Sequence, residues 1–459
     1  MRTIFAVYRQ ALKAAFRSRV FFFLLGLSLL AATAIPLTVR GDGTAVGAVQ
    51  AGLTYSLQAV GVLLSLAAVW LGCSGLSREI ENYTLHMVVT KPVSAFRLWL
   101  GKYLGVLTVT AIPMVVCGGV IYGLMSWKLN GGDFSEEELA RARREVLVGR
   151  REWGPVRPDF NKLAMQRYDE LAGEGRLDPD HDKEQVVKEL LRQVRAASTE
   201  VAPAQVRRWR FANIHGSGDG EFFCFRYRIY VDSTSSSRQR ATFGVWHVVN
   251  PDKEGQADGE AFLPQRAMGG SFHELKIPFA LVGEDGGLIV EYLNSDPRQA
   301  SVIFQLEDGP SVLIPVVSFS ANYFQGIVVV VVRIARLAVL GCAMGAIFSS
   351  PVAVFVAMAY LFLSVTADTV FRESTSRDSQ TGRPYGYNMF SYGTAVAVDT
   401  VIISLREFDA PGRLSRGYLI GWRGIGNVLL FQLVLRGVPL AALGVFVLHR
   451  RELGKVVRQ

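Results

Sequence analysis

Cysteine is scarce in this sequence, and its placement excludes a disulfide framework. The 459 residues contain 4 cysteines. Cys73, Cys117 and Cys342 fall within uncharged apolar runs, and Cys224 stands alone in a hydrophilic segment. A framework of bridges needs paired cysteines, and a cysteine metal site needs close, regular spacing. Neither pattern occurs, so we expect neither feature to organise the fold.

Short catalytic motifs are also missing. No G-x-x-x-x-G-K-[ST] sequence occurs, so the chain cannot bind ATP as a P-loop NTPase. There is no H-E-x-x-H, C-x-x-C or G-x-S-x-G sequence either. His273 and Glu274 have no second histidine at metal spacing and are expected to be ordinary strand-edge polarity. We therefore expect no enzymatic activity, no resident cofactor and no metal in this chain.

Charge is low overall, at 19% of residues, and long stretches have none. The uncharged runs are Val20–Val39, Gly43–Ser77, Tyr103–Trp127 and Leu337–Ala367. Apolar runs of about 20 residues are long enough to cross a bilayer, and buried helices of soluble proteins are rarely so uniform. These runs predict an integral membrane protein.

The net charge of +9 is unevenly distributed. The segment Lys128–Ser311 contains 25 basic and 30 acidic residues, a net charge of −5, which leaves +14 on the rest of the chain. Positive charge beside apolar runs is typical of lipid-headgroup contact and of membrane topology. We therefore expect membrane lipid rather than nucleic acid as the partner of the basic residues.

The apolar runs and basic clusters predict six transmembrane helices with both termini in the cytoplasm. The expected spans are Val20–Val39, Ala51–Leu76, Tyr103–Trp127, Tyr323–Phe348, Val352–Phe371 and Ile425–Leu448. Basic residues precede the first span and occupy the tail His449–Gln459, and such residues favour the cytoplasmic side. Residues 1–19 are expected to form an in-plane interfacial helix, with a plain basic tail as the alternative. The expected apolar face of this helix consists of Ile4, Phe5, Tyr8, Leu12 and Phe16.

The segment 128–311 is then extracytoplasmic, between the third and fourth spans. Residues 128–204 have helical periodicity, and Ser135 followed by Glu138 predicts a capping box. Residues 205–311 alternate as strands do, for example in Phe223–Val231 and Ala241–Val249. The expected fold class is thus an α-helical membrane bundle of six helices with an α+β outer domain, a helical stalk followed by a β-sandwich.

Two membrane regions flank this domain, residues 1–127 and 312–459. The second contains an outer segment, 372–423, in which residues 398–408 carry an apolar stripe typical of an interfacial helix. Cell-membrane location follows from the spans.

Three arginines interrupt the second membrane region. Arg333 and Arg336 lie within the expected fourth span and Arg436 within the sixth. An arginine exposed to lipid costs at least about 2.5–3.5 kcal/mol, so such residues face the bundle interior or reach the headgroups. They are candidate contacts for an anionic substrate or a lipid headgroup. One alternative places a span before Arg333 and another after Arg336; a purely structural role for the arginines is also open.

The polar stretch Leu76–Leu107 resembles the first cytoplasmic loop of type-2 ATP-binding-cassette (ABC) permeases. That loop has an acidic segment leading to Thr-Leu, then Pro-Val-Ser and Gly-Lys. Here these are Arg78–Glu81, Thr84-Leu85, Lys91–Ser94 and Gly101-Lys102. Asn82-Tyr83 and Ala95 depart from the family pattern. The resemblance covers both membrane regions, through the basic N-terminal helix and the ending Arg450–Leu453, but not the segment 128–311.

The resemblance implies a coupling helix in the loop 77–102, docked on a separate P-loop ATPase subunit that holds ATP and Mg²⁺. It also implies a second permease chain, identical or homologous. The expected coupling residues are Arg78, Glu79, Glu81, Thr84, Leu85, Lys91, Pro92, Arg97 and Lys102. Mixed charges of this kind suit a wet interface, and Pro92 suits a fixed turn. An ordinary charged loop that follows the positive-inside rule is the alternative.

The expected function is therefore the permease subunit of an ABC exporter, and the outer domain can bind substrate, contact an envelope partner or cap the path. The main alternative is a multi-pass receptor or sensor whose β-sandwich binds a glycan or peptide. Fold alone does not choose between these roles.

Overall fold

The computed structural model describes residues 2–39, 41–81, 94–131, 134–177, 182–215, 222–231, 241–298, 300–306, 309–375 and 409–450, with the backbone only for 367–375. The described chain forms two compact units. The helical unit contains the residues up to Gly149, those from Val317 to Phe371, and residues 409–450. The β unit contains Arg150–Val316.

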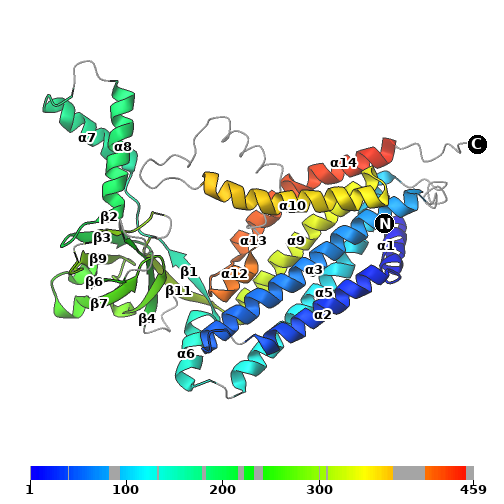
Figure 1. Ribbon diagram of the computed structural model, residues 1–459, viewed down its shortest axis with the longest axis horizontal. Helices are drawn as coiled ribbons and strands as arrows, with labels where there is room; N and C mark the ends of the chain where they lie inside the picture. The colour runs from blue at the N-terminus through cyan, green and yellow to red at the C-terminus, as the bar shows by residue number, and fades with distance from the viewer. Residues whose placement is uncertain are drawn as a thin grey trace, which may run out of the picture. The chain divides into compact units, whose positions relative to one another are not determined.

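The helical unit is a bundle of long apolar helices (Figure 1). Its elements are α1 (Arg2–Ala15), α2 (Arg19–Thr38), α3 (Ala45–Glu81), α5 (Ala95–Asn130), α6 (Glu136–Glu145), α9 (Phe319–Ile347), α10 (Ser350–Thr375), α12 (Ala410–Ser415), α13 (Trp422–Val428), the π-helix η5 (Leu429–Leu435) and α14 (Gly437–Arg450). Five described helices are long and apolar enough to cross a membrane: α2, α3, α5, α9 and the continuous stretch Trp422–Arg450. The prediction of a membrane-protein fold is confirmed at this level. The apolar part of α10, Ser350–Thr366, is shorter, so a sixth crossing stays a prediction.

The centre of the bundle is the pair α3 and α9, which approach each other through glycines. A Cβ atom on Gly341 would lie 2.7 Å from the Val69 carbonyl oxygen, and one on Gly72 would lie 2.8 Å from the Cys342 nitrogen. The Ser77 hydroxyl donates a hydrogen bond to the Gly345 carbonyl at 3.1 Å. Small residues allow helix backbones to pack closely where lipid gives no hydrophobic driving force. The α3–α9 pair is therefore the closely packed centre of the bundle.

Helix α9 contains both Arg333 and Arg336, as the single-span prediction requires. Its bounds, Phe319–Ile347, leave no break at the arginines, and the placement of the crossings in this region stays a prediction. Asn322 near its start is buried and binds the irregular segment before α13, donating to the Tyr418 carbonyl and accepting from the Ile420 N–H. Burial of these polar groups is tolerated because they are hydrogen-bonded to each other.

Helix α1 is amphipathic, as predicted, but packs through a different face. Val7, Ala11 and Ala15 are buried, and a Cβ atom on Gly101 of α5 would meet the Val7 Cβ at 2.8 Å. Phe5 and Phe16, which were expected to share the apolar face, are 65% and 58% exposed. The small residues thus pack on α5 while aromatic rings and basic residues stay outside. Exposed aromatic rings beside basic residues suit an interfacial position, which remains a prediction.

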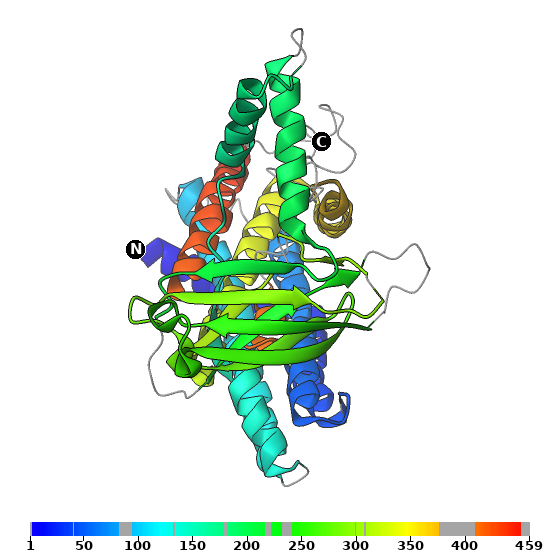
Figure 2. The same ribbon diagram turned by 90° about the vertical axis from the view of Figure 1, so that its left-hand side faces the viewer.

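The described residues of the β unit form three sheets and a helical hairpin (Figures 1 and 2). Its helices are α7 (Phe160–Gly173) and α8 (Lys183–Thr199), with short 3₁₀ turns at Pro251–Lys253, Ala257–Gly259 and Phe279–Leu281. The strands are β1 (Val148–Trp153), β2 (Glu200–Val201), β3 (Val206–Phe211), β4 (Phe222–Arg228), β5 (Tyr230–Val231), β6 (Ala241–Val249), β7 (Glu260–Met268), β8 (Phe272–Pro278), β9 (Leu288–Asn294), β10 (Val302–Ile303) and β11 (Ser311–Ser318). The sheet orders are β1-β11-β4-β8, β2-β10-β5 and β3-β9-β6-β7.

Aromatic side chains fill the space between the two four-stranded sheets. The fully buried Trp246 of β6 lies 4.9 Å from Phe225 and 4.6 Å from Tyr227 of β4, between ring centroids. Alternating inward residues of two sheets form such a core in a β-sandwich. The structure therefore confirms a β-rich unit with two facing sheets, as the β-sandwich prediction requires. The placement of this unit outside the membrane stays a prediction.

The unit boundaries differ from the predicted ones. The helical unit continues past Trp127 to Gly149, because α6 packs against α3. The predicted capping box is present at its start, between Ser135 and Glu138. The segment predicted to be wholly helical also contains β1, and β11 continues beyond the predicted end at Ser311. The predicted interfacial helix at 398–408 lies outside the described residues.

Candidate functional site

Five of the nine predicted coupling residues lie among the described residues, at the ends of two helices. Arg78, Glu79 and Glu81 lie on the last turns of α3, and Arg97 and Lys102 lie on the first turns of α5. The helices thus extend into the stretch predicted as a loop, 77–102. The remaining predicted residues, Thr84, Leu85, Lys91 and Pro92, lie outside the described residues.

Glu79 and Lys102 form an ion pair between α3 and α5. The Lys102 side chain is 4% exposed and that of Glu79 19%. The Gln10 side chain of α1 also donates to Glu79 at 3.5 Å, a long contact. A buried ammonium group needs a close carboxylate, since burial alone strongly disfavours the charged form. The ion pair therefore fixes the two helices where they leave the apolar bundle.

Glu81 links α3 to the beginning of α10. Its Oε1 accepts a hydrogen bond of 2.7 Å from the backbone N–H of Ser350, the first residue of α10. A carboxylate at a helix N-terminus satisfies a free N–H and interacts favourably with the helix dipole. Arg78 and Arg97 are exposed and remain accessible from outside the chain. One end of the bundle is thus joined across α1, α3, α5 and α10.

The three membrane arginines are not brought together as one cluster. Arg333 faces α3, where its Nη2 packs against the Gly61 backbone and leaves no room for a side chain there. Arg336 and Arg436 instead line a common cavity of about 590 Å³. Within the described chain, Nε and one Nη of both Arg333 and Arg336 have no hydrogen-bond partner.

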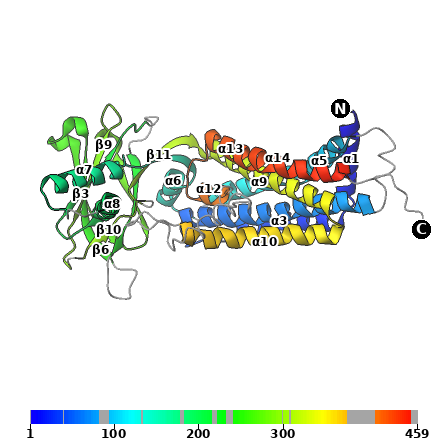
Figure 3. The ribbon, with the colours of Figure 1, turned by 90° about the horizontal axis from the view of Figure 1, so that it is seen from above.

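The cavity is lined by residues of α9, α10, η5 and α14. Helix α9 runs between α10 and α14 (Figures 2 and 3). Its walls are mostly aliphatic and aromatic, from Val356 and Tyr360 of α10 and from Phe431 to Leu443 on the other side. Arg436 follows the π-helical turns Leu429–Leu435, and its N–H bonds back to the Phe431 carbonyl at 3.2 Å. Single π-helical segments are rare and occur often at functional sites.

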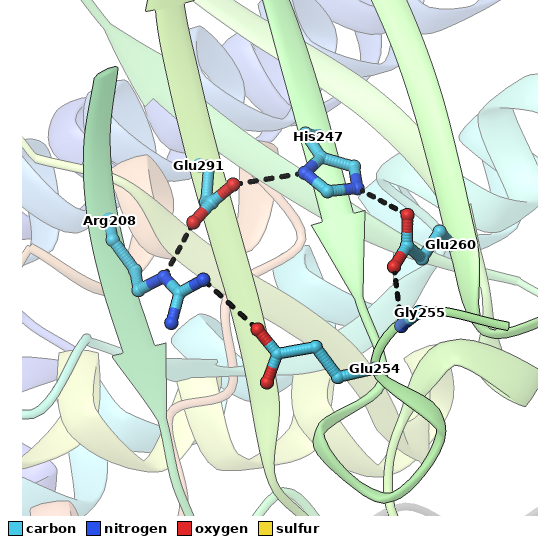
Figure 4. Close-up of polar contacts among 6 residues, drawn as sticks. All are labelled: Arg208, His247, Glu254, Gly255, Glu260 and Glu291. Atoms are coloured by element: carbon cyan, nitrogen blue, oxygen red, sulfur yellow. Dashed lines mark hydrogen bonds and ion pairs between the residues drawn. The ribbon is translucent and has the colours of Figure 1, made fainter.

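The β unit has a polar row on the sheet β3-β9-β6-β7 that the sequence did not reveal (Figure 4). Arg208, Glu291 and His247 are direct cross-strand partners on three neighbouring strands. His247 Nδ1 lies 2.9 Å from Glu291, and its Nε2 lies 3.0 Å from Glu260. The imidazole stacks on Phe262 at 4.1 Å. Alternation marks these residues as outward-facing, but only the strand register shows that they meet.

The two glutamates of this row titrate below the usual range. Burial of Glu291 opposes ionisation, but hydrogen bonds from His247 and Arg208 outweigh it and lower its pKa. A backbone hydrogen bond from Gly255, followed by one from His247, lowers the pKa of Glu260. Hydrogen bonds to a carboxylate favour the charged form. The row is thus a charged surface ladder at neutral pH.

A second cavity, of about 370 Å³, lies within the β unit beside α7 and α8. It is lined by Arg157, Arg207, Trp209 and Phe304 among others. The Arg207 guanidinium lies 5.4 Å from the Trp209 ring centroid, and burial lowers its pKa to about 10. A pocket with an aromatic wall and a cation has the composition of a small-ligand site.

Among the described residues, no three His, Cys, Asp or Glu side chains are grouped to hold a metal ion. His273 bonds to the backbone of Met268, and Glu274 pairs with the buried Arg150 at 3.0 Å. Comparison with protein-family models, curated proteins and solved structures finds no match.

Proposed function

We propose that this chain is the membrane-spanning permease subunit of an ABC exporter, driven by ATP hydrolysis on a separate subunit. The proposal combines the loop pattern of residues 76–107 with one structural observation: Glu79 and Glu81 join four helices at the end of the bundle where that loop begins. The chain then contributes six crossings with both termini in the cytoplasm, and a second permease chain completes the path.

The contacts at this end explain how a partner can transmit force. A subunit that pushes on the segment between α3 and α5 acts on helices tied by the Glu79–Lys102 pair. Through Glu81 the same displacement reaches the N-terminus of α10. Rigid-body movement of packed helices is a common way to alternate access to a path. In this proposal the loop acts mechanically, and the nucleotide chemistry belongs to the partner.

The exposed Arg97 provides the test. The tagged full chain is purified from its own membranes, and the co-purifying proteins are identified together with their ATPase activity. We expect a P-loop ATPase with the wild type and its loss with Arg97→Glu, because charge reversal places like charges across a wet interface. Arg176→Glu, at an exposed position in the β unit, is the matched control. Absence of an ATPase from the wild type would refute the proposal.

A receptor or sensor is the second candidate, favoured by the cavity around Arg207 and Trp209. A glycan or peptide bound there, with no ATPase in the purified assembly, would favour this alternative. An envelope partner on the outer unit is compatible with either function.

A further inference from the structure

The cavity between α9, α10 and α14 combines two cations with apolar walls. Arg336 and Arg436 line it, and none of its described lining residues is acidic. The other described contacts are Tyr360 and aliphatic or aromatic side chains such as Leu340, Val356 and Leu435. A cavity of about 590 Å³ falls in the size range of small-molecule sites.

Arg336 is the more deeply buried of the two arginines. It is 3% exposed, and its Nε and one Nη have no hydrogen-bond partner among the described residues. A guanidinium has five N–H donors in a fixed fork that matches carboxylate and phosphate oxygens. Buried charges are normally paired, so this side chain is arranged for an anion that enters from elsewhere.

The shape of the chain around the cavity supports a bound group. The π-helical turns Leu429–Leu435 end at Arg436, so the wall opposite Arg336 departs from regular α-helix at the second cation. On the α9 side, Arg336, Leu340 and Met344 lie at successive fourth positions and form one stripe. A ligand on this stripe meets a cation at one end and only apolar groups along the rest.

We propose that this cavity binds an anionic amphiphile. Its carboxylate or phosphate is held by Arg336 and Arg436, and its apolar body lies along Leu340 and Met344. The further idea that this ligand is the transported substrate rests on the proposed permease function. The proposal that the ligand binds here is independent of that function. The ligand has two possible sources, a membrane phospholipid with an acidic headgroup or a free lipophilic acid.

Arg333 is excluded from the site and serves as its internal control. It lies on α9 three residues before Arg336 and also has unpartnered nitrogens within the described chain. It packs against Gly61 of α3, however, and does not line the cavity. A general effect of lost charge in the bundle should appear at both positions, whereas a ligand contact should appear only at Arg336.

The test is native mass spectrometry of the purified full chain in detergent, without ATP or an ATPase. The probes are dilauroyl phosphatidylglycerol, dilauroyl phosphatidylcholine and laurate. We expect Arg336→Gln and Arg436→Gln to bind the preferred anionic probe about tenfold to a hundredfold more weakly than wild type, as for lost charged hydrogen bonds. Arg333→Gln should bind like wild type. Leu340→Trp, which fills the cavity and keeps both arginines, should also abolish binding.

Each pattern of probes has a distinct meaning. Binding of both anions, but not of phosphatidylcholine, supports a site for the anionic group alone. Binding of phosphatidylglycerol only identifies a lipid source, and binding of laurate only identifies a free acid. The proposal would be overturned if phosphatidylcholine bound as tightly as the anionic probes. It would also be overturned if Arg333→Gln weakened binding as much as Arg336→Gln. The proposed permease function would stand in that case, since its test is the co-purifying ATPase.

Discussion

At the scale of single residues, Lys102 shows how a charge is kept inside an apolar bundle. Its ammonium group is almost fully buried, and the Glu79 carboxylate from α3 is its ion-pair partner. Such a pair contributes little beyond two apolar residues of similar size, but removal of one partner leaves a charge without compensation. Substitutions of Glu79 and of Lys102 should therefore have unequal effects on stability, and their combined effect should be strongly non-additive.

Glu79→Gln should lower the free energy of unfolding by an amount near the lower end of about 3–5 kcal/mol, since Glu79 is 19% exposed. The double variant Glu79→Gln, Lys102→Met should recover most of this loss, because no charge remains buried. Thermal unfolding in detergent is followed with a thiol-reactive dye, which reports exposure of the buried Cys73 and Cys342. Glu137→Gln, at an exposed position on α6, is the control. Lys102→Met is also measured alone. If the stability losses of the two single variants simply add in the double variant, this account is contradicted.

The glutamates of the β3-β9-β6-β7 sheet predict a loss of stability in acid. Their folded pKa values are lowered from 4.5, so they stabilise the fold above that value. This contribution is lost as the pH falls below 4.5 and through the lower folded values, because the unfolded chain then binds more protons. Above 4.5 it is fully present.

Glu291→Gln should therefore be less stable than wild type at neutral pH and should lose less stability on acidification below 4.5. The melting temperature of the β unit is measured in the full chain by tryptophan fluorescence, since Trp246 lies at the centre of its core. Glu284→Gln, at an exposed position of the same unit, should keep the wild-type pH dependence. Identical acid profiles for Glu291→Gln and wild type would show that the ladder does not couple to folding.

At the scale of elements, the glycines of α3 and α9 determine how closely the central helices pack. A Cβ atom on Gly341 would lie 2.7 Å from the Val69 carbonyl oxygen, which belongs to the backbone and cannot turn aside. Gly341→Ala should therefore destabilise the bundle by about 1–3 kcal/mol, as overpacking does. Gly119→Ala on α5, with nothing within 4 Å of the new Cβ, should be neutral or slightly stabilising. The same dye assay measures both, and equal melting temperatures would disprove close packing at Gly341.

The sequence predicted those elements whose signal is local. The uncharged run after Arg336 and the apolar run before Arg333 predicted α9, because hydropathy extends over the whole helix. The sequence-based prediction misplaced the end of α3 and the start of α5. Charged residues mark where the lipid-exposed part of a helix ends, whereas the helix itself continues for as long as its backbone is hydrogen-bonded. Strand β6 was predicted with its observed bounds, Ala241–Val249. The alternation in β3, with three arginines in six residues, gave no such signal.

The candidate sites depend on contacts between distant parts of the chain. Arg336 and Arg436 are separated by a hundred residues, and they line a common cavity only because residues of α9, α10 and the stretch Leu429–Arg450 surround it. Arg333, three residues from Arg336, points to a different helix. The charged row of the β unit likewise depends on the register of four strands. Hydrophobic periodicity predicts which face a residue occupies, but not the residue opposite it.

At the scale of the whole molecule, the proposed function requires a definite topology. Six crossings place the start of α5 and the end of α14 on the cytoplasmic side and the β unit on the other side. If α10 does not cross, the end of α14 lies on the same side as the β unit. Reporter cysteines distinguish these arrangements, because Cys73, Cys117 and Cys342 are buried and only Cys224 has to be replaced by Ser.

Arg97→Cys, Asp258→Cys and Arg450→Cys each introduce a thiol at an exposed position, on α5, in the β unit and at the end of α14. In intact cells, a membrane-impermeant maleimide should label only the Asp258→Cys variant, because the other two thiols then face the cytoplasm. After permeabilisation all three should react, which is the control for accessibility. Labelling of Arg450→Cys from outside would reduce the crossings to five. Labelling of Arg97→Cys from outside would exclude contact with a cytoplasmic ATPase, and with it the proposed permease function.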